Sequence, residues 1–222
     1  MSMRKTQFVN GEFYHIYNRG VDKRNIFSSP NDLQRFFQSM NEFNVLEPIG
    51  SIYENSFSNK QLGGLASKSE KLINFVAYCL NPNHYHFLLE QVAERGIEKF
   101  MHRVGTGYTR YFNDKNKRNG ALFQGKFKSI HVDSNEYLLH LSAYVNLNDR
   151  VHQLGGKASK LVGSKTSWGE YLGKTRENFC KKEIIFDQFD DIVAYKEFAE
   201  NSLKDIIERK QLKTELEELF LE

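Results

Sequence analysis

Two histidines flank one tyrosine in the middle of the chain, at His84 and His86, directly after a turn signal at residues 81–83. Side chains alternate faces along a β-strand, so both imidazoles project from the same face of a strand that starts here. Two neighbouring imidazoles can chelate a divalent cation, although the same pattern also fits a solvated strand face. A zinc site would need further ligands, and no cysteine lies at a suitable spacing.

A second pair of candidate residues lies on a predicted helix. Tyr144 and Asn148 are four residues apart in LLHLSAYVNLND, which places them one turn apart on one helical face. The capping-box pattern from Asp133 to Glu136 predicts the start of this helix, which we expect to run to about Leu147. If its face lies against the histidine strand, the mixed nitrogen and oxygen donors suit Mg²⁺ or Mn²⁺ better than a structural zinc.

These residue types fit nucleophilic chemistry beside a cation. A tyrosine hydroxyl can act as the nucleophile if its deprotonation is assisted. Tyr137 is a rival nucleophile seven residues before Tyr144. We assign Tyr137 to packing because no amide residue follows it four positions later.

The elements that must position these residues follow the order β-α-β-β-α-β-α. The expected strands cover residues 13–18, 72–80, 84–90 and 122–132, the expected helices 30–40, 97–113, 133–147 and 184–222, and the expected loops 48–70 and 155–167. This order is close to the split βαβ pattern. It predicts an α+β fold with a ferredoxin-like antiparallel sheet and helices on one face, followed by a helical C-terminal extension.

Basic residues gather in the segment from Met101 to Ile130, although the net charge of the chain is only +3. This segment has a single acidic residue, Asp114, and interleaved aromatic side chains that could stack on bases. We expect single-stranded nucleic acid to bind here and beside the first strand. The candidate phosphate-binding residues are Arg19, Lys23, Arg24, Arg103, Arg110, Lys115, Lys117, Arg118, Lys126 and Lys128.

The two site motifs resemble those of a known family. NPNHYHFLLE looks like the histidine-hydrophobic-histidine (HUH) signature, and YLLHLSAYVNLNDR looks like the tyrosine helix, of the one-tyrosine single-strand DNA transposases, in particular the REP-associated tyrosine transposases. Three further stretches fit the same family: FYHIYNRGVDKRNIF, YTRYFNDKNKRNGALFQGKFKSI and SWGEYLG. The resemblance covers about residues 8 to 175.

The resemblance implies a role for each candidate residue. His84, His86 and Asn148 would bind Mg²⁺ or Mn²⁺, and Tyr144 would form a 5′-phosphotyrosine intermediate during cleavage and rejoining of single-stranded DNA at hairpin-flanked sites. The family commonly has proline after the asparagine, whereas this chain has Asp149. We expect a catalytic HUH domain over residues 8–152, and a loop with a helical extension over residues 153–222.

Two other functions remain open. A replication initiator or relaxase also pairs two such histidines with tyrosine, and a ferredoxin-like module could bind nucleic acid without cleaving it. Relatives occur as monomers and as homodimers that exchange the tyrosine helix, and the sequence does not choose between them. The chain has no apolar run of membrane-spanning length and only two widely separated cysteines, so we expect a cytoplasmic protein.

Overall fold

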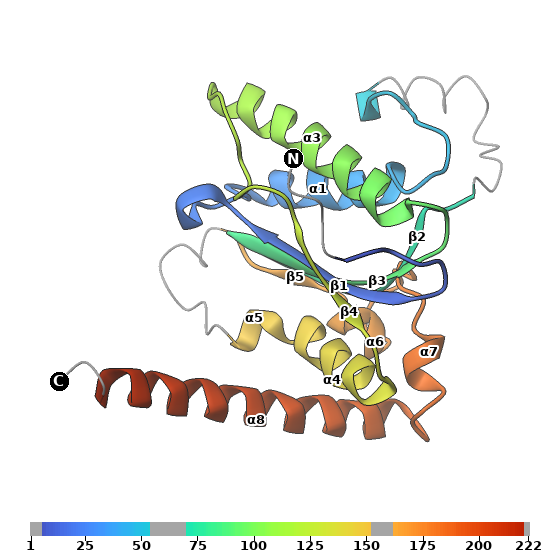
Figure 1. Ribbon diagram of the computed structural model, residues 1–222, viewed down its shortest axis with the longest axis vertical. Helices are drawn as coiled ribbons and strands as arrows, with labels where there is room; N and C mark the ends of the chain where they lie inside the picture. The colour runs from blue at the N-terminus through green and yellow to red at the C-terminus, as the bar shows by residue number, and fades with distance from the viewer. Residues whose placement is uncertain (1–5, 54–69, 152–161, 220–222) are drawn as a thin grey trace.

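The computed structural model describes residues 6–53, 70–151 and 162–219, with side chains up to residue 210. These residues form an α+β fold in which helices cover both faces of one antiparallel sheet (Figure 1). The sheet has the order β4-β1-β3-β2-β5. Its strands are β1 (Phe13–Arg19), β2 (Ile73–Asn81), β3 (His84–Gln91), β4 (Lys128–Val132) and β5 (Lys165–Thr166).

The first four strands have the order 4-1-3-2, which confirms the predicted ferredoxin-like arrangement. Strands β2 and β3 form the predicted hairpin, in which Asn81 pairs with His84 and Cys79 with His86. Strand β1 runs antiparallel to β3, so Tyr17 lies beside His86 and Arg19 beside His84. Paired residues project to the same side of a sheet, so this register fixes which side chains of β1 lie near the histidines.

One face of the sheet is covered by α1 (Pro30–Glu42) and α3 (Gly96–Asn116). Helix α1 begins with Pro30 at its first position, and the Ser29 side chain caps it by accepting a hydrogen bond from the Asp32 amide. Gly107 of α3 faces the ring of Phe43, and a β-carbon there would come within 2.9 Å of that ring. Gly107 therefore allows Phe43, at the end of α1, to approach α3 closely.

The other face is covered by the late helices, which corrects the expectation of helices on one face only. The helices are α4 (Asn135–Asn146), α5 (Asn148–Val151), α6 (Trp168–Tyr171), α7 (Glu183–Phe186) and α8 (Ile192–Leu219). Figure 1 shows α4, α5 and α8 on the side of the sheet opposite α1 and α3. The sheet therefore separates two hydrophobic cores.

Several predicted boundaries differ from the structure. The predicted strand 122–132 begins only at Lys128, because the residues before it turn at Gly125, whose φ is +69°. Helix α4 is capped by Ser134 rather than Asp133. The predicted helix 184–222 is divided into α7 and α8. Most of the predicted loop 48–70, the first part of the predicted loop 155–167, and residues 220–222 lie outside the described residues.

No helix in the part of the chain that the structure describes has both the length and the apolar character needed to cross a membrane.

A buried polar network attaches α4 to α8 and to the sheet. The hydroxyl of Tyr195 in α8 accepts a hydrogen bond from Asn146 Nδ2 at 2.9 Å and lies 3.0 Å from Ser142 Oγ. Ser167 Oγ donates to Asn146 Oδ1 at 2.6 Å and also accepts from the amide of Tyr78 in β2. A buried polar group without a partner is costly, so the network fixes α4 in one position on the sheet.

We predict that Tyr195→Phe lowers the free energy of unfolding by about 1–3 kcal/mol, because Asn146 Nδ2 then lacks its buried acceptor. Urea unfolding followed by circular dichroism measures this change. Tyr137→Phe, which removes a half-buried hydroxyl without any hydrogen bond in the described structure, is the matched control. An equal loss in both variants would contradict a specific role for the network.

A second buried contact joins α1 to α3. The side chain of Asp32 is fully buried and accepts hydrogen bonds from Lys115 Nζ at 2.5 Å, from the Tyr111 hydroxyl at 3.1 Å and from the Ser28 amide at 2.9 Å. Burial by itself raises the pKa of this carboxyl, but the Lys115, Ser28 and Tyr111 donors together bring the pKa below its ordinary value. Folding therefore favours the ionised form of Asp32.

This lowered pKa gives a pH-dependent contribution to stability. The contribution is fully present above the unfolded pKa of about 4 and is lost as the pH falls through the lower folded value. We predict that Asp32→Asn costs about 1–3 kcal/mol at neutral pH, and that its difference from wild type shrinks below about pH 4. Asp114→Asn, a change at an exposed carboxylate on α3, is the control in urea unfolding at each pH. A difference that stays constant with pH would contradict the prediction.

Candidate functional site

The two predicted motifs meet on the α4 side of the sheet, within one chain. The Tyr144 ring of α4 lies edge-on to the His86 ring of β3, with 5.5 Å between the ring centroids. Asn148 begins α5, and its Oδ1 lies 3.2 Å from His84 Nε2. The structure therefore brings together, within one chain, all four side chains predicted to do chemistry.

His84 is oriented by its neighbour in the turn between β2 and β3. Its Nδ1 lies 2.6 Å from Asn83 Oδ1, which can only accept a hydrogen bond. His84 therefore carries its proton on Nδ1, and the lone pair of Nε2 faces Asn148 Oδ1 and Asn81 Nδ2. A neutral imidazole in this state is the form that binds metal ions.

His86 is oriented by a third histidine, His15 of β1. Nδ1 of His86 lies 2.9 Å from Nε2 of His15. Burial lowers the pKa of His15 to about 4, so His15 is neutral at pH 7 and its Nε2 can accept a hydrogen bond from His86. In that arrangement the second nitrogen of His86, Nε2, keeps a lone pair for a ligand.

Asn148 lies between the histidines and the tyrosine. Its Oδ1 accepts a hydrogen bond from Asn81 Nδ2 at 2.8 Å, whereas its Nδ2 is buried without a hydrogen bond to any residue that the structure describes. Burial raises the pKa of the Tyr144 phenol, and the Asn148 side chain opposes that rise. The phenol is therefore protonated at neutral pH, beside an amide donor that has no other partner.

The donor set fits a hard divalent cation that also keeps water or phosphate oxygens. His84 Nε2 and Asn148 Oδ1 face one another, and Asn148 holds its oxygen in this position although its Nδ2 stays unpaired. Among the described residues, no group of three His, Cys, Asp or Glu side chains is placed to hold a metal ion. Two imidazoles and one amide oxygen would thus leave coordination positions open for a substrate.

A cavity of 470 Å³ opens beside the tyrosine. Its walls come from β1, β3, β4, α4 and α8, and its lining residues are His15, Tyr17, His86, Ile130, Tyr137, His140, Leu141, Tyr144 and Ile206. Tyr17 stacks on His86 with 5.6 Å between the ring centroids. Tyr137, the rival nucleophile, lines this cavity and packs on the core beneath α4. The cavity is therefore largely aromatic, with the Tyr144 ring in its wall.

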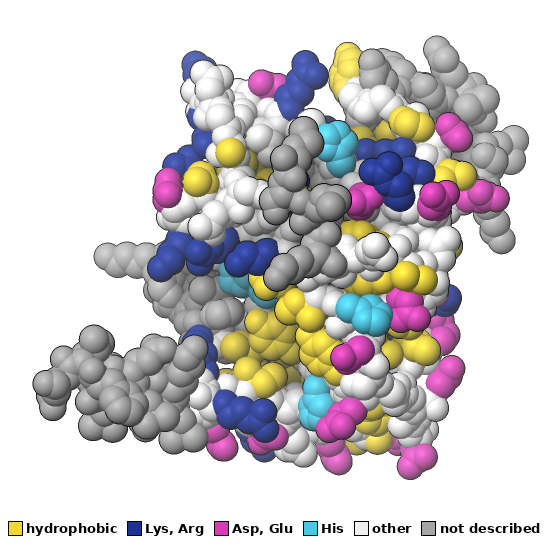
Figure 2. All heavy atoms as spheres, viewed as in Figure 1, with side chains coloured by type: hydrophobic (Ala, Val, Ile, Leu, Met, Phe, Trp, Pro, Cys, Tyr) yellow, Lys and Arg dark blue, Asp and Glu magenta, His cyan; other side chains and the backbone are white. Residues whose placement is uncertain are grey.

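Some predicted DNA-binding residues lie near this cavity. Arg19 and Lys128 are exposed on the same side of the sheet as the histidines, since Arg19 pairs with His84 and Lys128 with Tyr17. Lys23 and Arg24 are exposed just after β1, in and beside the short 3₁₀ helix η1 (Val21–Lys23). Figure 2 shows Lys and Arg side chains gathered mainly on the left half of the view.

Arg19 donates a hydrogen bond to Gln124 and Arg24 pairs with Asp22, and three other predicted DNA-binding residues also have contacts within the chain. Arg103 donates to the carbonyl groups of Phe43, Val45 and Leu46, which follow α1. Lys115 pairs with buried Asp32, and Arg118 bonds to groups near the end of α3. We interpret these three as structural residues. Arg110, Lys117 and Lys126 have no ion pair in the described structure.

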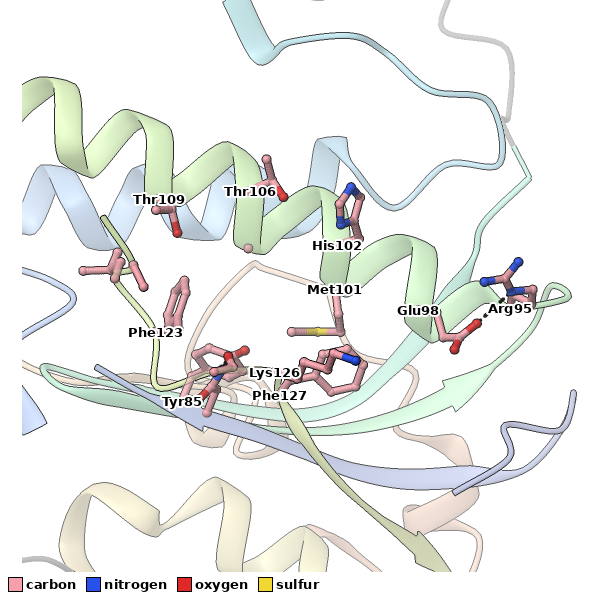
Figure 3. Close-up of a pocket in the computed structure, with 15 residues that line it drawn as sticks. Tyr85, Arg95, Glu98, Met101, His102, Thr106, Thr109, Phe123, Lys126 and Phe127 are labelled. Carbon is pink, nitrogen blue, oxygen red and sulfur yellow. Dashed lines mark hydrogen bonds and ion pairs between the residues drawn. The ribbon is translucent and has the colours of Figure 1, made fainter. Parts of the chain in front are cut away.

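A larger groove of 790 Å³ lies on the opposite side of the sheet, under α3 (Figure 3). Met101, Thr106 and Thr109 of α3 face Phe123 and the rest of the segment before β4 across this groove. Lys126, a predicted phosphate-binding residue, also lines the groove, and so does the aromatic residue Phe127. The groove contains neither the histidines nor Tyr144, so its larger volume does not make it the candidate site.

Sequence reasoning missed several side chains around the site. His15 and Tyr17 alternate along β1 on the histidine side, and Cys79 and Asn81 lie on the same side at the end of β2. Strand alternation could have found all four, but only once the register between the strands was known. Asp149, which replaces the common proline, is half-buried, and burial raises the pKa of its carboxyl.

Comparisons with known proteins agree with this geometry. Residues 61–148 match the family model described as "Transposase IS200 like", a segment that contains both histidines and Tyr144 and ends at Asn148. No curated protein matches the chain.

One solved structure, a REP-associated tyrosine transposase bound to a REP hairpin, shares the fold with a TM-score of 0.50 and 10% sequence identity. The match covers 82% of this chain and 98% of that chain. The α+β fold and the family resemblance seen in the sequence are therefore confirmed.

Proposed function

We propose that this protein cleaves and rejoins single-stranded DNA with Tyr144 as the nucleophile, because residues 61–148 match the family model described as "Transposase IS200 like". The observation that carries this proposal is the meeting of Tyr144, His86, His84 and Asn148 at one point of one chain. A binding module without catalysis has no need for this convergence, or for the paired support of both imidazoles by Asn83 and His15.

The reaction is an exchange of phosphate esters. The Tyr144 hydroxyl oxygen forms a bond to the scissile phosphorus and its proton leaves to water, while the bond from phosphorus to the 3′ oxygen breaks and that oxygen takes a proton from water. The products are a 5′-phosphotyrosine and a DNA strand with a free 3′-hydroxyl. Attack of a 3′-hydroxyl on the phosphotyrosine then rejoins DNA and releases Tyr144, so no external energy source is needed.

Burial of Tyr144 is an obstacle to this reaction, and the residues around it counteract this effect. Burial disfavours the phenolate, which is the stronger nucleophile. The unpaired Asn148 Nδ2 can donate a hydrogen bond to the oxygen as charge develops on it. His84, His86 and Asn148 would hold Mg²⁺ or Mn²⁺, which supplies charge withdrawal from the phosphate and fixes its orientation.

The surroundings of the cavity suit a single strand that leaves a hairpin. Tyr17 and Tyr137 offer ring faces to unpaired bases, and exposed Arg19 and Lys128 lie where phosphates can be neutralised. The neighbour with the same fold is bound to a REP hairpin. We therefore propose a hairpin-flanked single strand as the substrate, while the sequence of the target is set by contacts that this arrangement does not specify.

The first test is formation of a covalent adduct. Wild-type protein incubated with single-stranded hairpin DNA and Mg²⁺ or Mn²⁺ is expected to give a protein–DNA band on a denaturing gel, and removal of the metal with EDTA is expected to abolish it. Tyr144→Phe should give no adduct because it lacks the attacking oxygen.

Tyr137→Phe is the matched control for this test, since Tyr137 lines the same cavity, and it should retain the adduct. An adduct in Tyr144→Phe, or its loss in Tyr137→Phe alone, would overturn the assigned roles. Salt-dependent binding of the hairpin without any adduct in wild type would instead support a non-catalytic binding module.

The second test concerns the exposed basic residues. Removal of a lysine or arginine that contacts phosphate weakens binding to all sequences alike and lowers the slope of log K against log salt by about 0.7 per contact on a single strand. We expect Arg19→Ala and Lys128→Ala to behave in this way in fluorescence anisotropy titrations of hairpin DNA.

Lys196→Ala, at an exposed lysine of α8, is the matched control and should leave the affinity and the salt slope unchanged. Unchanged binding by both test variants would show that the strand does not follow the proposed course past β1 and β4.

A further inference from the structure

The hydrogen bonds of Asn81 carry an inference that rests on the proposed function and deepens it. Asn81 is the last residue of β2, and its side chain is fully buried. Its Nδ2 lies 2.8 Å from Asn148 Oδ1 and 2.9 Å from His84 Nε2. We infer that Asn81 is a positioning residue, which holds Asn148 Oδ1 in place for a divalent cation and occupies His84 Nε2 until the cation binds.

The orientation of the Asn81 amide follows from the groups around its oxygen. Oδ1 accepts a hydrogen bond from Ser164 Oγ at 2.7 Å and from the thiol of Cys79 at 3.5 Å. A thiol donates and Asn148 Oδ1 only accepts, so the Oδ1 of Asn81 belongs on the Cys79 side and the Nδ2 on the Asn148 side. Ser164 lies just before β5, so the sheet edge beside β2 supports the site from outside the catalytic helix.

The geometry matches the needs of a cation at this point. An amide nitrogen carries two hydrogens, so Nδ2 can donate one to His84 Nε2 and the other to Asn148 Oδ1. Both acceptors then direct one lone pair at Asn81 Nδ2 and lie near each other, although they belong to β3 and α5. Without this donor, the two acceptors would stand 3.2 Å apart with their lone pairs facing each other.

The two acceptors differ in whether they keep the hydrogen bond from Asn81 when a cation binds. Asn148 Oδ1 has two lone pairs, so it can coordinate a cation and still accept the hydrogen bond from Asn81. His84 Nε2 has one lone pair, so it must exchange that hydrogen bond for the cation. Asn81 therefore keeps Asn148 in position throughout, while it releases His84.

A purely structural role for Asn81 predicts something different. In that case loss of the amide would lower the stability of the protein and leave the affinity for the cation unchanged in the folded molecule. The positioning role predicts a loss of affinity in a protein that still folds, because groups that orient metal ligands typically contribute about 10-fold to 100-fold in affinity.

The test is a titration of the DNA-free protein with Mn²⁺, followed by electron paramagnetic resonance of the free ion. Asn81→Leu keeps the side-chain size and removes both donors. Asn74→Leu is the matched control, since Asn74 lies on the same strand and bonds to Glu90 instead. Thermal unfolding of each variant reports whether the fold is retained.

We expect Asn81→Leu to raise the Kd for Mn²⁺ about 10-fold or more, and Asn74→Leu to leave it unchanged. A Kd within about twofold of wild type in folded Asn81→Leu overturns the inference, as does a wild type that binds no Mn²⁺. If Asn81→Leu does not fold, Ser164→Ala takes its place, because it frees the anchored Oδ1. Ser164→Ala must then raise the Kd several-fold, and an unchanged Kd overturns the inference.

Adduct formation separates this inference from the proposed function. With saturating Mn²⁺, Asn81→Leu is expected to form the Tyr144 adduct, since its defect lies in affinity for the cation. A wild type that forms the adduct, together with an Asn81→Leu variant of unchanged Kd, refutes the positioning role and leaves the proposed function intact. A wild type that binds Mn²⁺ in the predicted way but forms no adduct refutes the proposed function alone.

Discussion

The packing of α4 against the histidine side of the sheet is the constraint on which the site depends. The tyrosine and the asparagine come from two consecutive short helices, and the imidazoles come from a central strand. Their distances are set by how closely α4 approaches β2 and β3, and this approach is fixed by hydrogen bonds of Asn146 and Ser142 inside the second core. The polar network beneath α4 thus helps to position the proposed active site, although none of its residues lines the cavity beside Tyr144.

Hydrogen bonds support the side chains of the site, with the exception of one buried amide nitrogen. Each imidazole has a partner at Nδ1, and the amide of Asn81 joins Asn148 to His84. Asn148 Nδ2, by contrast, is buried without a hydrogen bond in the part of the chain that the structure describes. An unpaired buried donor is unfavourable in the free protein, and an anion that accepts its hydrogen bond removes this penalty. The unpaired donor can therefore favour the charged species of the proposed reaction over the protein without substrate.

The sequence predicts β1, β2 and β3 and the convergence of the four candidate residues, because alternation in β3 and the four-residue spacing of Tyr144 and Asn148 are local patterns. The sequence does not predict which face of the sheet α4 covers, because this depends on which apolar residues pack on each of the two faces. His15, Cys79 and Asn81 were missed for the same reason: their position beside the histidines follows from strand register. Arg103, Lys115 and Arg118 counted as DNA-binding residues because composition cannot distinguish an exposed cation from one held by a carbonyl or a buried carboxylate.

The sheet that separates the two cores also divides the molecule into parts with different evolutionary freedom. Substitutions among the residues packed between α1, α3 and the sheet change the side chains of a core that is separate from the one containing Tyr195. The side chains of the groove under α3 can accordingly change one at a time while Tyr144 keeps its place. The proposed chemistry on one side of the sheet is thus compatible with different surfaces on the other.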